Sequence, residues 1–167
     1  SPVSIGLSPS GSFLYVVDQV APPDVVNGVD QNAGRGDITV FQIDTSTGKL
    51  TLITNQNTFN TSGTQLPYFT VNYKPVQVIT NGSFVYVLDQ AYTIVPGGPS
   101  QNPTVPAGCF ENATTEAACA TADVFLYAAS SNGQLTLTQN APLQIGTLPG
   151  AASTIYSSGK YVYIADT

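Results

Sequence analysis

Three aspartates occupy the same place in a repeated phrase of the sequence, and carboxylates arranged in this way could bind a cation. Asp18, Asp89 and Asp166 each follow a short apolar and aromatic run of strand type. Carboxylate and carbonyl oxygens are the ligands that Ca²⁺ prefers, so these acids, helped by Gln19 and Gln90, are candidate calcium ligands. The alternative is that each carboxylate accepts hydrogen bonds from backbone amides at a strand end. Whole repeats separate the three acids, so they cannot all share one ion.

The residue types of common catalytic sites are scarce. The chain has no histidine, which excludes a serine–histidine–aspartate triad and a thiolate–imidazole pair within it. No motif links any two of its ten acids, as paired carboxylates for glycoside hydrolysis would require. The triplet Arg35-Gly36-Asp37 has the form of an adhesion ligand, or it simply opens a strand. We therefore predict no catalytic residue within this stretch.

The two cysteines indicate an oxidising compartment. Cys109 and Cys119 lie ten positions apart in a loop-like segment, and the sequence has no histidine or second cysteine pair to complete a zinc site. We expect a local disulfide between them, which implies a secreted or cell-surface protein. Asn60, Asn81 and Asn112 stand in sequons and are candidate glycosylation sites in that setting.

The charge balance excludes one class of partner. Ten acids against four cations give a net charge of −6. Nucleic-acid binding requires a basic patch, because released phosphate counterions supply much of the affinity. No apolar run is long enough to cross a bilayer. We therefore expect neither nucleic-acid binding nor a membrane span.

Two phrases repeat along the chain. The first, a glycine turn followed by an apolar strand and an aspartate, occurs at 8–19, 80–90 and 157–167. The second, two strands joined by a short turn with glycine, occurs at 37–52 and 123–137. No helical apolar period persists. Repeats of this kind, which bury their faces only against their neighbours, are typical of stacked β units.

These repeats predict an all-β fold of four-stranded antiparallel β-propeller blades in an incomplete ring. One blade covers 1–55, a second covers 76–139 with an insertion loop at 91–121, and a partial blade covers 151–167. A seven-stranded sandwich is the alternative, although it would not repeat one phrase in every fourth strand. The expected strands are 3–7, 12–18, 37–44, 49–54, 76–80, 83–89, 122–129, 134–139, 151–156 and 160–166.

The first blade carries a family resemblance. Its phrase Ser8-Pro9-Ser10-Gly11-Ser12-Phe13-Leu14-Tyr15-Val16, followed by 36–44 and by Thr47-Gly48-Lys49-Leu50, resembles the blade consensus of lactonase or 6-phosphogluconolactonase-like seven-bladed β-propellers. The resemblance covers essentially every expected strand and implies a propeller. Enzymes of that fold use His, Arg and Glu side chains, which cannot be matched here, so the catalytic residues of such an enzyme would lie outside this stretch.

About two and a half blades would leave two apolar blade faces uncovered. Either more chain covers these faces or other copies of the protein do. No initiator methionine or signal peptide is visible, so we expect the chain to begin after processing or inside a longer protein.

The long connections are expected on one face, because the segments 19–36, 55–75, 90–121 and 140–150 alternate with tight turns. Aromatic pairs such as Phe13 and Tyr15 are expected to pack between blades rather than stack on sugars. The sequence thus predicts a secreted, non-catalytic module for surface interaction or assembly, for instance a filament or layer subunit. Its partners would be proteins or copies of itself at the blade edges and the long-loop face. The alternatives are a fragment of a lactonase-type hydrolase and a carbohydrate- or calcium-binding propeller.

Overall fold

The prediction of an all-β fold with antiparallel sheets is confirmed by a computed structural model of the chain. Strands make up its regular structure, and no helix occurs in the described part of the chain. Accordingly, this part contains no helix long and apolar enough to span a membrane. The described residues are 1–30, 32, 35–57, 59–60, 62–71, 75–90, 122–139, 141–145 and 152–166.

The first sheet follows the order β1-β2-β5-β6, with every pair of neighbours antiparallel. A further short strand, β7, pairs with β5 beyond the end of β6 and runs in the same direction as β6. β6 and β7 are therefore one outer strand, interrupted by the loop 54–68. The strands of this sheet are β1 (Pro2–Leu7), β2 (Phe13–Asp18), β5 (Asp37–Ile43), β6 (Leu50–Ile53) and β7 (Phe69–Thr70).

The second sheet repeats this plan in the order β8-β9-β10-β11, and its outer strand is also split, because β11 and β12 pair with successive parts of β10. A third layer consists of the hairpin formed by β13 (Ala152–Ser157) and β14 (Val162–Asp166). The strands of the second sheet are β8 (Pro75–Asn81), β9 (Phe84–Asp89), β10 (Ala122–Ala129), β11 (Leu135–Leu137) and β12 (Leu143–Ile145).

Four short strands lie in segments that the sequence predicted as loops. β7 and β12 are the second halves of the split outer strands, and two or three residues are too few to show a period-two pattern. β3 (Val25–Val26) and β4 (Val29–Asp30) form a hairpin inside the 19–36 connection. Its turn is Asn27-Gly28, with φ of 50° and 80°, the pair that two-residue hairpin turns favour.

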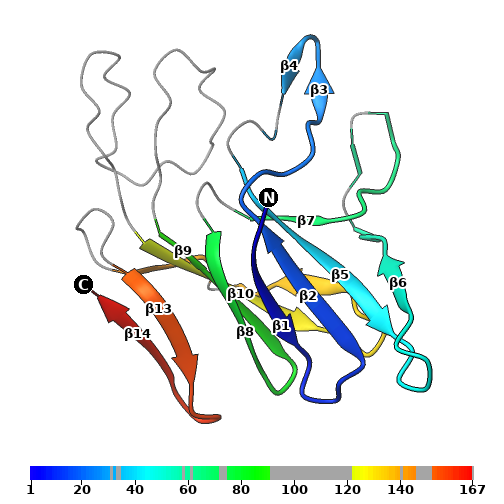
Figure 1. Cartoon of the computed structure of the whole chain (residues 1–167). Coiled ribbons are helices and arrows are strands. Elements are labelled where there is room, and N and C mark those ends of the chain that lie inside the picture. Colours follow the sequence, from blue (N-terminus) through cyan, green and yellow to red (C-terminus); the bar gives the residue numbers. More distant parts are fainter. Residues whose placement is uncertain are drawn as a thin grey trace, which may run out of the picture.

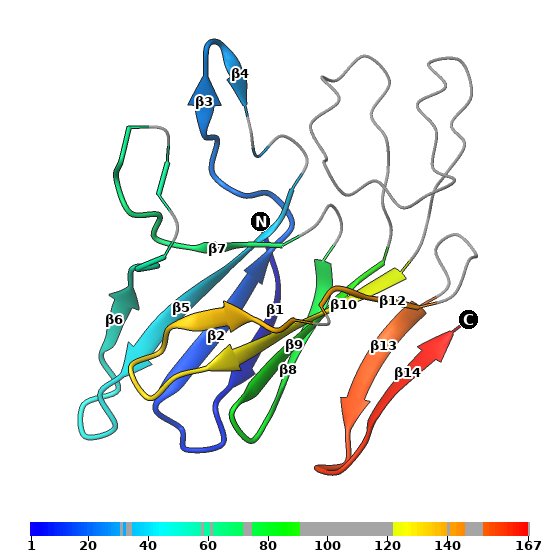
Figure 2. The same cartoon turned by 180° about the vertical axis from the view of Figure 1, so that it is seen from behind.

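The three layers lie side by side and the second is packed on both faces (Figures 1 and 2). The innermost strands β1, β8 and β13 are neighbours across the layers. One apolar cluster fills the space between the first and second sheets, with Tyr15, Val17 and Val87 among its buried members. A second cluster, which includes Leu88 and Ile155, joins the second sheet to the β13–β14 hairpin.

A bulge recurs at one position in the innermost strand of every layer. The register with the next strand shifts between Pro2 and Ser4, between Pro75 and Gln77, and between Ala152 and Thr154. Bulges re-aim side chains. The residues that follow the three bulges therefore occupy equivalent places at the start of each layer.

The connections separate into two ends of the molecule. Tight turns join β1 to β2, β5 to β6, β8 to β9 and β13 to β14 at one end, drawn at the bottom of Figure 1. The β3–β4 hairpin and the loop 54–68 project from the opposite end. The last residue of β2, Asp18, and the first of β5, Asp37, lie at this loop end.

Candidate functional site

The acids at the loop end occur as cross-strand pairs. Asp18 of β2 lies directly opposite Asp37 of β5, and Asp89 of β9 lies directly opposite Asp123 of β10. The sequence grouped the second-strand acids Asp18, Asp89 and Asp166 but missed the partners on the third strand. The sequence did contain a signal for these partners. Both copies of the second phrase begin with an aspartate, Asp37 and Asp123. Antiparallel pairing places the start of that phrase opposite the end of the first phrase, where Asp18 and Asp89 stand.

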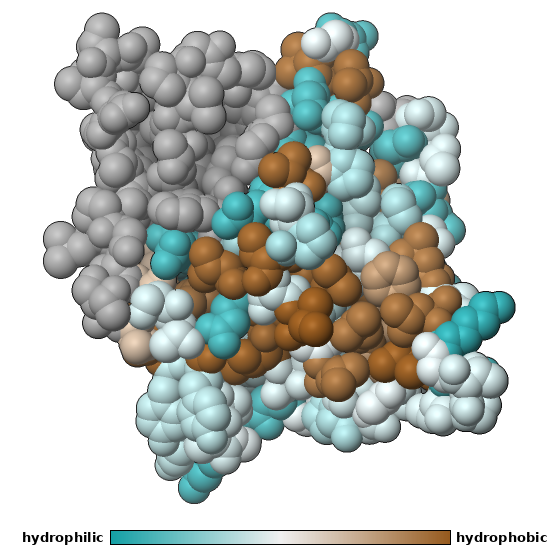
Figure 3. Space-filling model, in the orientation of Figure 1, coloured by the Kyte–Doolittle hydropathy of each residue, from teal (hydrophilic) through white to brown (hydrophobic). Residues whose placement is uncertain are grey.

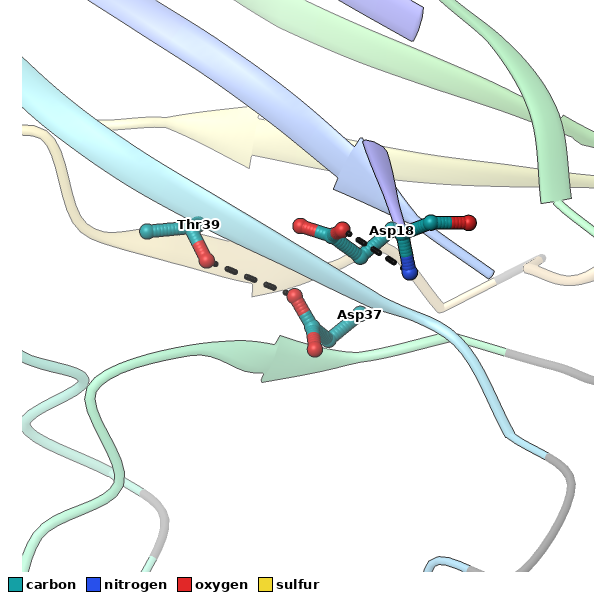
Figure 4. Close-up of polar contacts among 4 residues, drawn as sticks. Asp18, Asp37 and Thr39 are labelled. Carbon is teal, nitrogen blue, oxygen red and sulfur yellow. Dashed lines mark hydrogen bonds and ion pairs between the residues drawn. The ribbon is translucent and has the colours of Figure 1, made fainter. Parts of the chain in front are cut away.

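Burial dominates the chemistry of the first pair. Asp37 is only 2% exposed. Burial, and to a smaller extent the negative charge of Asp18, raise the pKa of its carboxyl to about 7. A hydrogen bond from Thr39 Oγ1, at 3.4 Å, and the amino group of Ser1 act in the opposite direction. Figure 4 shows this arrangement. Asp18 forms an ion pair with the amino group of Ser1, and the distance from Ser1 N to Asp18 Oδ1 is 3.4 Å.

The second pair is buried as well. Asp89 is 0% exposed, and Asp123 is also buried. Like charges directly opposite each other destabilise a sheet, and burial of both acids adds a desolvation penalty. Each sheet therefore carries two acids at the place where its second and third strands meet the loops.

Gly36 lets the first pair sit against the second sheet. A Cβ at this position would lie 2.3 Å from Pro75 Cγ and 2.4 Å from the carbonyl oxygen of Asp18. The carbonyl of Gly36 also accepts a hydrogen bond from the amide of Val71, at 3.0 Å. The Arg35-Gly36-Asp37 triplet thus enters a strand and packs against a neighbouring layer. Because its Asp is buried, the triplet does not form an exposed adhesion loop.

The loop rim above the first sheet is held by polar contacts. Asn32 Nδ2 donates to the carbonyl of Pro22 at 2.8 Å and to Tyr68 Oη at 2.7 Å. Tyr68 Oη in turn donates to the Pro22 carbonyl at 3.2 Å, and its ring packs with Ala21 and Leu66. Burial raises the pKa of Tyr68. These contacts join the described parts of the β2–β5 connection and of the loop 54–68 into one rim.

The Tyr68→Phe variant tests this rim. It keeps the ring packing but removes both hydrogen bonds of the hydroxyl, and it leaves Asn32 Nδ2 with one partner fewer. We expect a loss of about 1–2 kcal/mol in the free energy of unfolding, measured in urea. Thr51→Val, which removes the hydroxyl of an exposed threonine of β6, is the control and should cost nothing measurable. Equal stability of Tyr68→Phe and the wild type would show that these contacts do not order the rim.

The remaining sequence-predicted sites fall in different places. Asn60 Oδ1 accepts hydrogen bonds from the amides of Ser62 and Thr64 in a turn of the rim. Asn81 Nδ2 donates to the carbonyl of Gly159 at 2.8 Å, so it joins the turns of the second and third layers. The backbone of Asp166 ends β14. Cys109, Cys119 and Asn112 lie outside the described residues, as does the insertion loop 91–121.

Metal binding requires several convergent ligands. Within the described ranges, no three Cys, Asp or Glu side chains come together in a way that could hold a metal ion. At the described junctions of the second and third strands, the acids are arranged as two pairs, each within its own sheet. The unit repeated at the loop end is thus a carboxyl pair at a strand junction.

The phrases at 8–16, 36–44 and 47–50, on which the expected resemblance to lactonase-like propellers rests, lie at β2, β5 and the start of β6. Compared with models of protein families, with curated proteins and with solved structures, the chain matches none.

Proposed function

We propose that the chain is a non-catalytic, extracellular module of β-propeller-type blades that acts in assembly through its open sheet faces. One observation carries the proposal: the second sheet is covered on both sides, whereas the first sheet and the hairpin each leave an apolar or aromatic face open. A sheet buried on both faces between like sheets is the arrangement of blades in a propeller. The open faces are where further sheets would pack.

The open face of the first sheet is broad and apolar. Side chains alternate along each strand, and on β2 the alternation separates buried Phe13, Tyr15 and Val17 from the part-exposed Leu14 and Val16. Apolar side chains on this outward side extend across the neighbouring strands of the sheet (Figure 3). We call this surface the sheet-one face; its residues are Ile5, Leu7, Leu14, Val16, Phe41, Ile43, Leu50 and Leu52.

The open face of the hairpin is aromatic. Tyr156, Tyr161 and Tyr163 are all more than half exposed, and the rings of the last two meet edge to face with centroids 6.4 Å apart. We call these three residues the hairpin face. Tyrosine is enriched in protein interfaces because its ring buries a large area while its hydroxyl stays hydrogen-bonded. Large contiguous patches of this kind mark sites of protein association.

The chemistry of the loop end fits a structural role for the acids. Asp37 and Asp89 are enclosed at their strand junction and do not reach solvent, where a substrate would bind. The extracellular setting rests on the low content of charged residues, 8%, and on the expected disulfide between Cys109 and Cys119.

Sedimentation velocity of the purified chain tests the proposal. An assembly module should show an average mass above that of one chain, rising with concentration between about 1 and about 100 μM. The driving force is apolar burial, so raising the salt concentration should leave this association intact or strengthen it. A single species with the mass of one chain over the whole range would contradict the proposed function.

A further inference from the structure

The two internal joints between layers are built on one plan, which can be followed residue by residue. Ser4, Gln77 and Thr154 follow the three bulges and pair with Val17, Leu88 and Ala165 respectively. Each of these three partners stands directly before the aspartate of the repeated phrase. The strands β1, β8 and β13 therefore align position by position, and so do β2, β9 and β14.

The apolar half of each joint uses opposite sides of the repeated strand. In the first joint, Tyr15 and Val17 of β2 pack in one cluster with Val85 and Val87 of β9. In the second joint, Tyr86 and Leu88 of β9 pack in one cluster with Val162 and Ile164 of β14. The tyrosine side of one layer thus always meets the valine and isoleucine side of the next layer.

A polar contact recurs in both joints. The amide of Val78 donates to Ser4 Oγ at 3.1 Å, and the amide of Ile155 donates to Gln77 Oε1 at 2.9 Å. Val78 and Ile155 are equivalent positions, one residue after Gln77 and Thr154. In each joint, the side chain after the bulge of one layer therefore accepts a hydrogen bond from the same amide of the next layer. This contact fixes the position of one innermost strand along its neighbour in the next layer.

Each of the two open faces corresponds to one side of this joint and has no layer packed against it. On the sheet-one face, Ile5 occupies the position of Val78; Ile5 is 68% exposed and Val78 only 3%. On the hairpin face, Tyr163 occupies the position of Tyr15; Tyr163 is 54% exposed and Tyr15 only 2%. One end of the stack therefore presents the valine and isoleucine side, and the other end presents the tyrosine side.

We propose that the hairpin face of one molecule docks on the sheet-one face of a second copy, head to tail, and reproduces the internal joint. Thr154 Oγ1 donates to Gln77 Oε1 at 2.9 Å within its own chain and keeps its lone pairs, with which it would accept a hydrogen bond from the amide of Ile5 in the second copy, as Ser4 does from Val78. The inference rests on the proposed function and specifies its geometry. Two sheet-one faces do not match each other in this way, because both joints in the chain pair unlike sides. Head-to-tail contacts form rings where the rotation closes and filaments where it does not.

Two single-face variants and their mixture test the docking. Ile5→Lys places a charge on the sheet-one face, and Tyr163→Lys places one on the hairpin face. Each variant alone should sediment mainly with the mass of one chain, because a lysine would be desolvated in the joint. Mixed in equal amounts, the two variants retain one intact sheet-one face and one intact hairpin face between them. The mixture should therefore form a one-to-one complex with twice the mass of a chain.

Controls separate folding from docking. Val25→Lys changes an exposed apolar residue of β3, away from both faces, and should associate as the wild type does. Circular dichroism and thermal unfolding should show the wild-type fold for each variant. If Ile5→Lys does not fold, Leu52→Lys replaces it, and Tyr161→Lys similarly replaces Tyr163→Lys, since both positions are exposed on the same two faces.

The outcomes distinguish this inference from the proposed function. Wild-type chains that never associate contradict both. Association that persists in Tyr163→Lys but not in Ile5→Lys means that two sheet-one faces meet, which overturns the head-to-tail arrangement and leaves assembly as the function. Association that persists in both variants, or a mixture that stays monomeric, also overturns the inference.

Discussion

Replacing Gly36 by alanine is expected to destabilise the protein by about 3 kcal/mol or more, a large share of the stability of a domain of this size. The added methyl group would overlap Pro75 and the backbone carbonyl of Asp18, at 2.3 and 2.4 Å. Neither neighbour is the free end of a flexible side chain. Relief requires β5 to move away from β2 or the second sheet to move away from the first, and either movement opens the joint between them.

Urea unfolding of Gly36→Ala and of Gly6→Ala measures this effect against a matched control. Gly6 also lies where the first sheet meets the second, but its added Cβ would find its nearest neighbour, Val78 Cγ1, at 3.4 Å, which is an ordinary contact. Gly6→Ala should therefore change the free energy of unfolding by less than about 1 kcal/mol. Equal effects of the two substitutions would show that the layers do not approach at Gly36 as closely as the structure has them.

The repeated phrases predicted the strands well because turn chemistry and strand chemistry agree there. A glycine with positive φ, such as Gly11 or Gly82, ends each tight turn, and an alternating apolar run follows it. All ten expected strands are present, within about two residues of their predicted ends. The β3–β4 hairpin was missed although its Asn27-Gly28 turn signals it, because the strands on either side have only two residues each.

The acid pairs could have been predicted, but their environment could not. Pairing the two phrases places Asp18 against Asp37 and Asp89 against Asp123. Burial depends on layers that lie beside the pair, and Gly36, which permits the approach of Pro75, has no local signature of that role. The polar contact of the joints was also hidden, because the equivalent residues Ser4 and Gln77 differ in type and share only a position after a bulge.

The stability of the protein should fall as the pH rises from about 4.5 to about 8, and Asp37 should be the main cause. In the unfolded chain an aspartate ionises near its ordinary pKa of 3.8, whereas burial and Asp18 raise the pKa of Asp37 to about 7 in the folded state. Below the unfolded value both states are protonated and no penalty exists. Between the two values only the folded state holds the proton, so stability decreases with pH until the penalty is complete above pH 7.

The expected size of this loss is on the order of 3–4 kcal/mol, since one unit of pKa corresponds to about 1.4 kcal/mol. Asp37→Asn carries a neutral amide of the same shape at every pH. Its free energy of unfolding should approach that of the wild type below about pH 3.8 and exceed it at pH 8. Asp18→Asn should leave part of the slope in place, because burial is the larger cause of the shift and the charge of Asp18 is the smaller one.

Asp44→Asn is the matched control, because this exposed aspartate shifts in the opposite direction. Hydrogen bonds from Ser46 and Thr47 lower the pKa of Asp44 to about 2, so its contribution is lost only as the pH falls through about 4 to 2. Asp44→Asn should therefore leave the slope between pH 4.5 and 8 unchanged. The opposite result is an Asp37→Asn variant that keeps the wild-type slope in that window. The Asp37 carboxyl would then have to be ionised and solvated in the folded state, which would contradict its burial opposite Asp18.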